Sequence, residues 1–103
     1  MAYKLITSNS ANEQIDNILS YVAIDLHNPG AARALAIDIA ESFNRIEEMA
    51  DTYGYCEDLY LRFRGYRKKR LKRHNYIIIY RIEGKKVHIS GVFHLLEDYA
   101  KKL

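Results

Sequence analysis

Apolar residues recur at helical spacing over the first half of the chain. The first stripe consists of Ile15, Ile18, Leu19, Val22 and Leu26. Apolar positions separated by three or four residues are typical of an amphipathic helix that buries one face. Ser10 precedes Glu13 by three residues, which is the spacing of a capping box. This pair therefore predicts that the first helix begins at Ser10.

A second helix is predicted directly after the first. Asn28-Pro29 separates the two, and proline suits the first helical position because its missing amide hydrogen would have no partner there. The second stripe consists of Leu35, Ile39, Phe43, Ile46 and then Met49 or Ala50. A break this short predicts an antiparallel helical hairpin.

The remaining apolar and aromatic positions predict strands. The expected strands are Ala2–Thr7, Tyr66–Lys72, Tyr76–Ile82 and Lys86–His94. The β-branched and aromatic run Tyr76–Tyr80 predicts a central strand buried on one face. We expect a loop over Asp51–Asp58 and a short helix or tail over Leu96–Leu103. The order β-α-α-β-β-β predicts a single α+β domain, with the hairpin packed on one face of a mostly antiparallel twisted sheet.

Charge divides the chain into two halves. Residues 1–61 carry three Lys and Arg against ten Asp and Glu, a net charge of −7. Residues 62–103 carry thirteen against three, a net charge of +10, and eight of the twelve residues from Arg62 to Arg73 are cationic. Both faces of the strand Tyr66–Lys72 carry charge, which favours an edge strand. Such a field attracts nucleic acid or an acidic protein; the alternative is a solvated edge.

The length of 103 residues and the single cysteine, Cys56, limit the number of domains and the possible disulfides. One domain is expected at this length, and no internal disulfide can form. No segment has the apolar length of a signal peptide or a membrane span, so we expect a cytoplasmic protein that does not bind membranes. The His and Cys residues lack metal-ligand spacing, and there is no glycine-rich phosphate loop. We therefore expect no metal and no small-molecule cofactor.

The chain resembles the RelE/ParE superfamily of bacterial toxins, once called plasmid stabilisation proteins. The resemblance is carried by the helical hairpin broken at Asn28–Ala32, the basic strand, the run Tyr76–Arg81 and the last strand ending Val92–His94. It implies the toxin of a type II toxin–antitoxin module, held inactive by a cognate antitoxin. RelE-like members cut messenger RNA on the ribosome, whereas ParE-like members block DNA gyrase.

The resemblance to the nuclease branch is partial. It implies that Lys69, Lys72 and Arg73 correspond to cationic strand residues, that His94 ends the last strand where nucleases place Arg or His, and that Tyr99 follows at the spacing of their C-terminal tyrosine.

Two departures weaken the nuclease hypothesis. Ile77 follows Tyr76 where nucleases often have Arg, and Arg81 comes only later in the strand. Leu95 follows His94, where both branches often have Arg.

His94 is also a candidate general acid or base on chemical grounds alone. Its reference pKa near 6.5 would allow proton transfer near neutrality; the alternative is a strand-end histidine that makes one ordinary hydrogen bond. Arg67, Lys69, Lys72, Arg73 and Arg81 are candidates for binding phosphates or another target.

Three hypotheses follow. We favour a ParE-like toxin that acts by binding DNA gyrase. The first alternative is a RelE-like ribosome-dependent messenger RNA endonuclease, with His94 and Tyr99 as catalytic residues. The second is a small non-toxic nucleic-acid-binding module.

Overall fold

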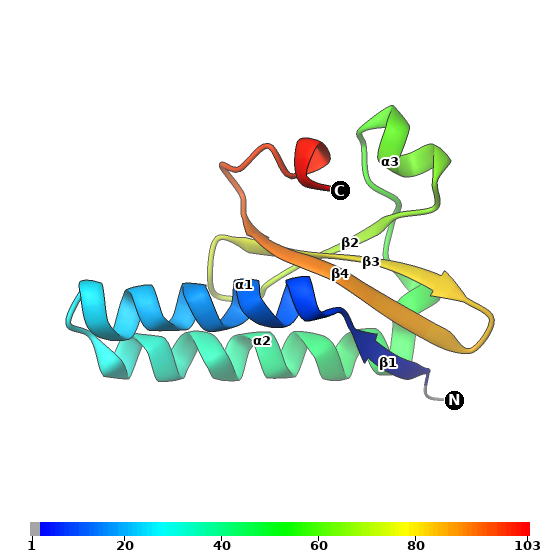
Figure 1. Ribbon diagram of the computed structural model, residues 1–103. Helices are drawn as coiled ribbons and strands as arrows, with labels where there is room; N and C mark the ends of the chain where they lie inside the picture. Colours follow the sequence, from blue (N-terminus) through cyan, green and yellow to red (C-terminus); the bar gives the residue numbers. More distant parts are fainter. Residues whose placement is uncertain (1–2) are drawn as a thin grey trace.

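The computed structural model describes residues 3–103, which form a four-stranded sheet with two long helices on one face (Figure 1). The strands are β1 (Lys4–Thr7), β2 (Arg67–Arg70), β3 (Tyr76–Glu83) and β4 (Lys86–His94). Their order in the sheet is β1-β4-β3-β2, with β1 parallel to β4 and the other neighbours antiparallel. The predicted α+β fold is confirmed, and β2 is an edge strand as expected. The predicted first strand began at Ala2, which lies outside the described residues.

The first helix, α1 (Asn9–Ser20), begins earlier than predicted. The Ser8 hydroxyl oxygen accepts a hydrogen bond from the Ala11 amide at 3.0 Å, so Ser8 and not Ser10 is the cap. Ser8 has the extended backbone of a residue that has just left β1, whereas Ser10 is already helical. The helix then continues into one π-helical segment, η1 (Tyr21–Asp25).

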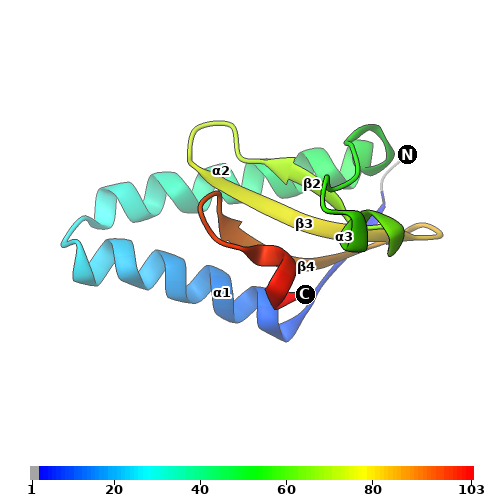
Figure 2. The same cartoon turned by 90° about the horizontal axis from the view of Figure 1, so that it is seen from above.

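The second helix, α2 (Pro29–Met49), begins where the sequence predicts. The Asn28 side chain accepts a hydrogen bond from the Ala31 amide at 3.0 Å, with Pro29 at the first helical position. The stripe ends on Ala50, which is fully buried at the start of the 3₁₀ turn η2 (Ala50–Thr52), while Met49 is 36% exposed. Figure 2 shows α1 and α2 side by side, with α2 nearer β2.

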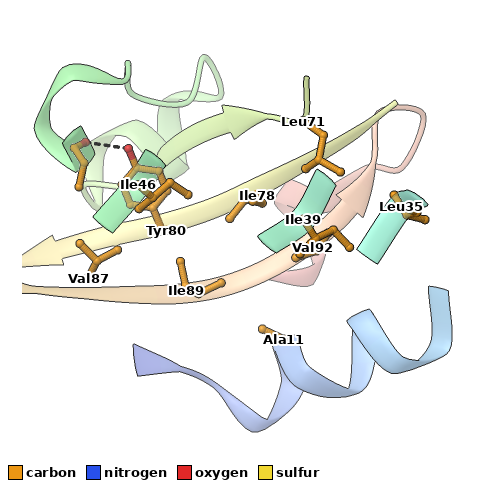
Figure 3. Packing of buried hydrophobic residues seen from close by; sticks show 11 residues of the cluster. Ala11, Leu35, Ile39, Ile46, Leu71, Ile78, Tyr80, Val87, Ile89 and Val92 are labelled. Atoms are coloured by element: carbon orange, nitrogen blue, oxygen red, sulfur yellow. Dashed lines mark hydrogen bonds between the residues drawn. The ribbon is translucent and has the colours of Figure 1, made fainter. Parts of the chain in front are cut away.

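The main hydrophobic core fills the space between the hairpin and the sheet (Figure 3). Ile39 and Ile46 of α2 pack there against Ile78 of β3 and Val87 of β4. The Tyr80 hydroxyl donates a hydrogen bond to the Ala50 carbonyl oxygen at 2.7 Å. Burial raises the pKa of Tyr80, and the hydrogen bond satisfies a polar group that would otherwise be costly inside the core.

A second cluster covers the opposite face of the sheet. The helix α3 (Leu59–Phe63) and the turn η3 (Tyr99–Lys102) lie over that face (Figure 2). The buried members of this cluster are Cys56, Leu61, Ile77, Ile79 and Phe93. The run Tyr76–Tyr80 is therefore buried on both faces, and the expectation of one buried face is wrong. The sequence predicts a loop over Asp51–Asp58 but does not predict the helix α3 that follows it.

A β-bulge shifts the pairing of β3 and β4. Ile79 pairs with Gly91, but Tyr80 pairs with Ile89, so Ser90 is the additional residue. Gly91 lies under the Phe93 ring, and a β-carbon there would be 2.4 Å from a ring atom. Only glycine leaves room for that aromatic side chain.

Candidate functional site

A groove of about 500 Å³ lies between α2 and the edge strand β2. Its lining residues are Asp38, Glu41, Ser42, Asn44, Arg45, Glu48, Tyr53, Lys69, Lys72 and Arg73. Positions three, four and seven residues apart along α2 face the sheet at this side. The groove thus brings together Lys69, Lys72 and Arg73, three of the candidate residues from the sequence.

A buried carboxylate fixes the turn that carries two of these cations. Asp38 is 1% exposed and accepts hydrogen bonds from the Arg73 amide at 2.9 Å and the Lys72 amide at 3.3 Å. Its Oδ2 also lies 2.7 Å from His74 Nδ1. Burial raises the pKa of Asp38, but the hydrogen bonds from His74 and the two amides outweigh it and hold the pKa below its ordinary value. Asp38 therefore anchors the β2–β3 turn to α2.

The cations of the groove differ in how they are paired. Arg73 Nη1 lies 3.1 Å from Glu41 Oε1. Lys69 Nζ lies 5.2 Å from the centroid of the Tyr53 ring and donates to the Arg70 carbonyl oxygen at 2.7 Å. Burial, and then the charge of nearby Arg45, lower the pKa of Lys69.

The structure places the other two candidate cations outside the groove. Arg67 donates to the Tyr53 and Asp51 carbonyl oxygens at 2.6 and 3.3 Å, and its guanidinium lies 4.1 Å from the Tyr55 ring centroid. Its side chain thus holds the loop before α3. Arg81 lies 5.3 Å from the Tyr66 ring centroid, on the face of the sheet that carries Ile79.

His94 ends β4 on the hairpin face of the sheet. Its Nδ1 accepts a hydrogen bond from the Leu96 amide at 3.1 Å, and its ring meets Tyr76 edge-on at 5.1 Å between centroids. Its own amide donates to Glu97 Oε1 at 2.8 Å. The imidazole is therefore held in one orientation.

Tyr99 lies on the other face. Its ring stacks on Phe93 at 5.7 Å between centroids and joins the second cluster, where burial raises its pKa. The two residues that the nuclease hypothesis pairs, His94 and Tyr99, thus occupy opposite sides of β4.

Asp38 and Arg45 were not among the candidates from the sequence. Asp38 follows Leu35 by three residues and so falls on the apolar stripe of α2. A carboxylate on a buried stripe signals a specific partner. Arg45 carries no such signal, because an exposed helical arginine is common.

The part of the chain that the structure describes has neither a metal-binding cluster nor a membrane-spanning helix. Within residues 3–103, no group of three or more His, Cys, Asp or Glu side chains is arranged to hold a metal ion. No helix in the same range has both the length and the apolar character needed to cross a membrane.

Comparison with known proteins decides the family. Residues 5–99 match the family described as the ParE toxin of the type II toxin–antitoxin system parDE. The chain belongs to this ParE toxin family. Among curated proteins, none matches it significantly in sequence.

Solved structures share the fold of this ParE-family toxin. A chain of the chromosomal ParDE system from P. aeruginosa superposes with a TM-score of 0.75 and 21% identity, over 90% of this chain and 96% of that one. A chain of the RelBE2 toxin–antitoxin complex from Mycobacterium tuberculosis superposes with a TM-score of 0.62 and 16% identity, over 91% and 99%.

Proposed function

We propose that this toxin arrests growth by binding DNA gyrase and that a cognate antitoxin neutralises it. Membership of the ParE family supports a toxin that acts by binding. The observation that carries this choice over cleavage is the separation of the groups that a nuclease would use. His94 and Tyr99 lie on opposite faces of β4, while the cationic groove lies beside β2.

RNA cleavage needs an acid, a base and phosphate-binding cations within hydrogen-bond reach of one phosphodiester. β3 lies between β4 and β2, and strands in a sheet are spaced by about 4.8 Å. The backbone of His94 is therefore about 10 Å from the basic strand. Tyr99 lies on the opposite face of β4 from His94 and the groove, and this placement supports a binding toxin over a nuclease built from these residues.

One observation favours the alternative, a ribosome-dependent messenger RNA endonuclease. The hydrogen bond from the Leu96 amide to His94 Nδ1 directs the proton of a neutral imidazole to Nε2. An oriented imidazole of this kind is suited to proton transfer.

The deciding experiment compares the two targets directly. Purified toxin is added to a gyrase supercoiling assay, and messenger RNA from cells expressing the toxin is examined by primer extension. We expect inhibition of supercoiling, no site-specific cleavage, and growth arrest that survives in His94→Ala. Cleavage of ribosome-bound messenger RNA that disappears in His94→Ala would instead establish the nuclease.

Neutralisation is tested by co-expression. A small acidic reading frame adjacent to the toxin frame should restore growth and co-purify with the toxin. Growth arrest that persists in the presence of that protein would contradict the proposed antitoxin.

A further inference from the structure

A second group of cations lies at the end of the sheet where the β3–β4 turn is placed. Lys4 of β1 and Lys86 of β4 are register partners on neighbouring strands. Arg81 of β3 pairs with His88 of β4, and Lys85 lies in the turn itself. The four residues Lys4, Arg81, Lys85 and Lys86 are called the basic tip below.

The basic tip belongs to the face of the sheet that α3 and η3 cover only in part. Val87 is buried in the main cluster on the hairpin face, so alternation places Lys86 and His88 on the other face. The register puts Lys4 and Arg81 beside them. The β3–β4 turn extends past α3 in both views of the molecule (Figures 1 and 2). The three lysines of the tip are exposed, so a large partner has access to them.

The cations of the tip lack carboxylate partners. Within residues 3–103, no carboxylate oxygen lies within 4.0 Å of the charged nitrogens of these four side chains. The backbones of Lys4 and Lys86 are about 4.8 Å apart, one strand spacing, so their ammonium groups repel each other. The Arg81 guanidinium is held over the Tyr66 ring. An anion among these groups would relieve the repulsion and meet an arginine that is already positioned.

One carboxylate lies close to the tip. Glu83 is the only acidic residue in β1, β3 and β4. Its Oε1 is 3.4 Å from His88 Nε2, a buried nitrogen that has no hydrogen-bond partner. Four cations against one carboxylate give this end of the sheet a formal charge of +3. The groove beside α2 differs, because its four cations face three carboxylates. The tip therefore accommodates a polyanion better than the groove does.

The tip has the surface chemistry of an interface with duplex DNA. Among the described residues, none of the exposed large apolar side chains belongs to β1, β3 or β4. Protein interfaces are centred on apolar and aromatic anchors, whereas interfaces with DNA are polar and strongly positive. Proteins that bind single strands stack bases on aromatic rings, but the Tyr66 ring beside the tip already carries Arg81.

We propose that the basic tip binds the phosphate backbone of duplex DNA, with its lysines as point charges and Arg81 donating hydrogen bonds to a phosphate oxygen. Phosphate contacts carry no sequence information, so binding is independent of sequence and strongly dependent on salt. The inference goes beyond the binding of gyrase and depends on the tip alone. Gyrase acts on DNA, so this contact would also hold the toxin close to its target; that consequence rests on the proposed function.

The test measures the fluorescence anisotropy of a short labelled duplex as full-length toxin is added at several salt concentrations. Four phosphate contacts predict a slope of about −3.6 when the logarithm of the association constant is plotted against that of the salt concentration. A duplex of unrelated sequence should bind equally well. In isotope-labelled toxin, the amide resonances of Lys4, Arg81 and Lys86 should shift on binding. Shifts confined to β2 and the groove would overturn the proposal.

A matched pair of double variants separates the tip from the overall charge. Lys4→Gln/Lys86→Gln removes two cations of the tip. Lys101→Gln/Lys102→Gln removes the same charge from η3, where each lysine is paired with a carboxylate. We expect the first variant to bind the duplex about tenfold more weakly and to reduce the salt slope by about 1.8, and the second to bind nearly as the wild type does. Equal losses would show that DNA responds only to net charge, and would overturn the proposal.

Glu83→Gln gives a test of opposite sign. Removing the carboxylate beside the tip should tighten duplex binding about threefold. Glu13→Gln, which makes the same change of charge on the exposed surface of α1, is the control. Binding by Glu83→Gln that is no tighter than binding by Glu13→Gln would contradict a site at the tip.

Competitors of other chemistry test the choice of duplex DNA. Polyglutamate and a single-stranded oligonucleotide are each added to the labelled complex, and both should displace the duplex less well than unlabelled duplex does. Tighter binding of either competitor at the tip would assign the surface to an acidic protein or to a single strand, and would overturn the proposal.

The outcomes separate this inference from the proposed function. A toxin that inhibits gyrase but does not bind duplex DNA through the tip loses only the inference. A toxin that binds DNA through Lys4 and Lys86 without inhibiting gyrase loses only the proposed target.

Discussion

The two faces of the sheet are covered by very different amounts of structure. Two long helices cover one face and bury eleven residues of the main cluster, whereas a five-residue helix and a 3₁₀ turn cover the other and bury five. The thin cover also exposes large apolar side chains, with Leu59 80%, Phe63 91% and Leu96 90% exposed. Stability should therefore depend on the hairpin face, while the opposite face contributes less.

Local contacts hold the thin cover in place. Isolated helices of five residues are unstable in water, so α3 depends on its anchors. The Asp58 carboxylate accepts a hydrogen bond from the Leu61 amide at 3.0 Å, and the Leu61 side chain is fully buried. Arg62 Nε adds a hydrogen bond to the Cys56 carbonyl oxygen at 3.2 Å, whereas the Leu59 and Phe63 side chains are largely exposed.

The strongest test of the comparison removes a core side chain on the hairpin face. Ile39→Ala should lower the free energy of unfolding by about 2–5 kcal/mol, because Ile39 is only 4% exposed and its loss leaves a cavity. Ile37→Ala on the same helix is the control, since Ile37 is 53% exposed. Chemical denaturation should separate the two variants. A loss below about 1 kcal/mol for Ile39→Ala would show that the packing assignment is wrong.

Asp38 tests how firmly α2 is joined to the β2–β3 turn. Asp38→Asn should lower the free energy of unfolding by about 1–3 kcal/mol at neutral pH, because a buried set of hydrogen bonds loses its charged acceptor. The folded-state pKa of Asp38 is below its ordinary value of 3.8. Its contribution is therefore complete above that value and is lost as the pH falls through the lower folded-state pKa.

Denaturation measured between about pH 2 and pH 7 should therefore show the wild type converging on Asp38→Asn at the acid end. Asp25→Asn, in η1, is the matched control. A constant difference between wild type and Asp38→Asn across this range would contradict the proposed anchor.

Gly91→Ala probes the second cluster from within the sheet. The added methyl group meets the Phe93 ring, which is 1% exposed and has no free space to move into. We expect a loss of about 1–3 kcal/mol from overpacking. Phe93→Leu should lower this cost, so the double variant should be less destabilised than the sum of the single changes. Strict additivity in a thermodynamic cycle would rule out the clash.

The smallest effect is expected at the exposed surface of α3. Phe63→Ser should change the free energy of unfolding by no more than about 0.5 kcal/mol, because Phe63 is 91% exposed. Leu61→Ser in the same helix should be clearly destabilising, since Leu61 is fully buried. Equal effects of the two substitutions would show that the buried Leu61 side chain does not anchor α3 to the sheet.

The sequence predicted the layers and the order of the elements because its longest patterns are periodic. The helical stripes, which end at Leu26 and at Met49 or Ala50, and the apolar run Tyr76–Tyr80 indicate those elements. The helix α3 escaped prediction because five residues are too few for a periodic signal and because arginines interrupt it. Because α3 is not predicted, no predicted element packs on the second face of the sheet. The sequence therefore indicates that Tyr76–Tyr80 is buried on one face only.

The site was predictable in its charge but not in its geometry. The run of basic residues identified Lys69, Lys72 and Arg73, which the groove does bring together. Sequence spacing could not separate them from Arg67, whose guanidinium binds backbone carbonyl groups of the preceding loop. The resemblance to the nuclease branch paired His94 with Tyr99, but the chain crosses to the other face of the sheet between them.

The bulge at Ser90 determines the phase of the last strand. Ile89 and Val92 both join the main cluster although three positions separate them, because Ser90 adds one residue to β4 without a partner on β3. If Ser90 instead paired with Ile79, strict alternation from Ile89 onward would exchange the two faces for every residue from Gly91 to His94. Phe93 would then turn toward the hairpin and His94 toward the thin cover. A single inserted residue thus sets the side of the molecule on which the chain's last histidine is presented.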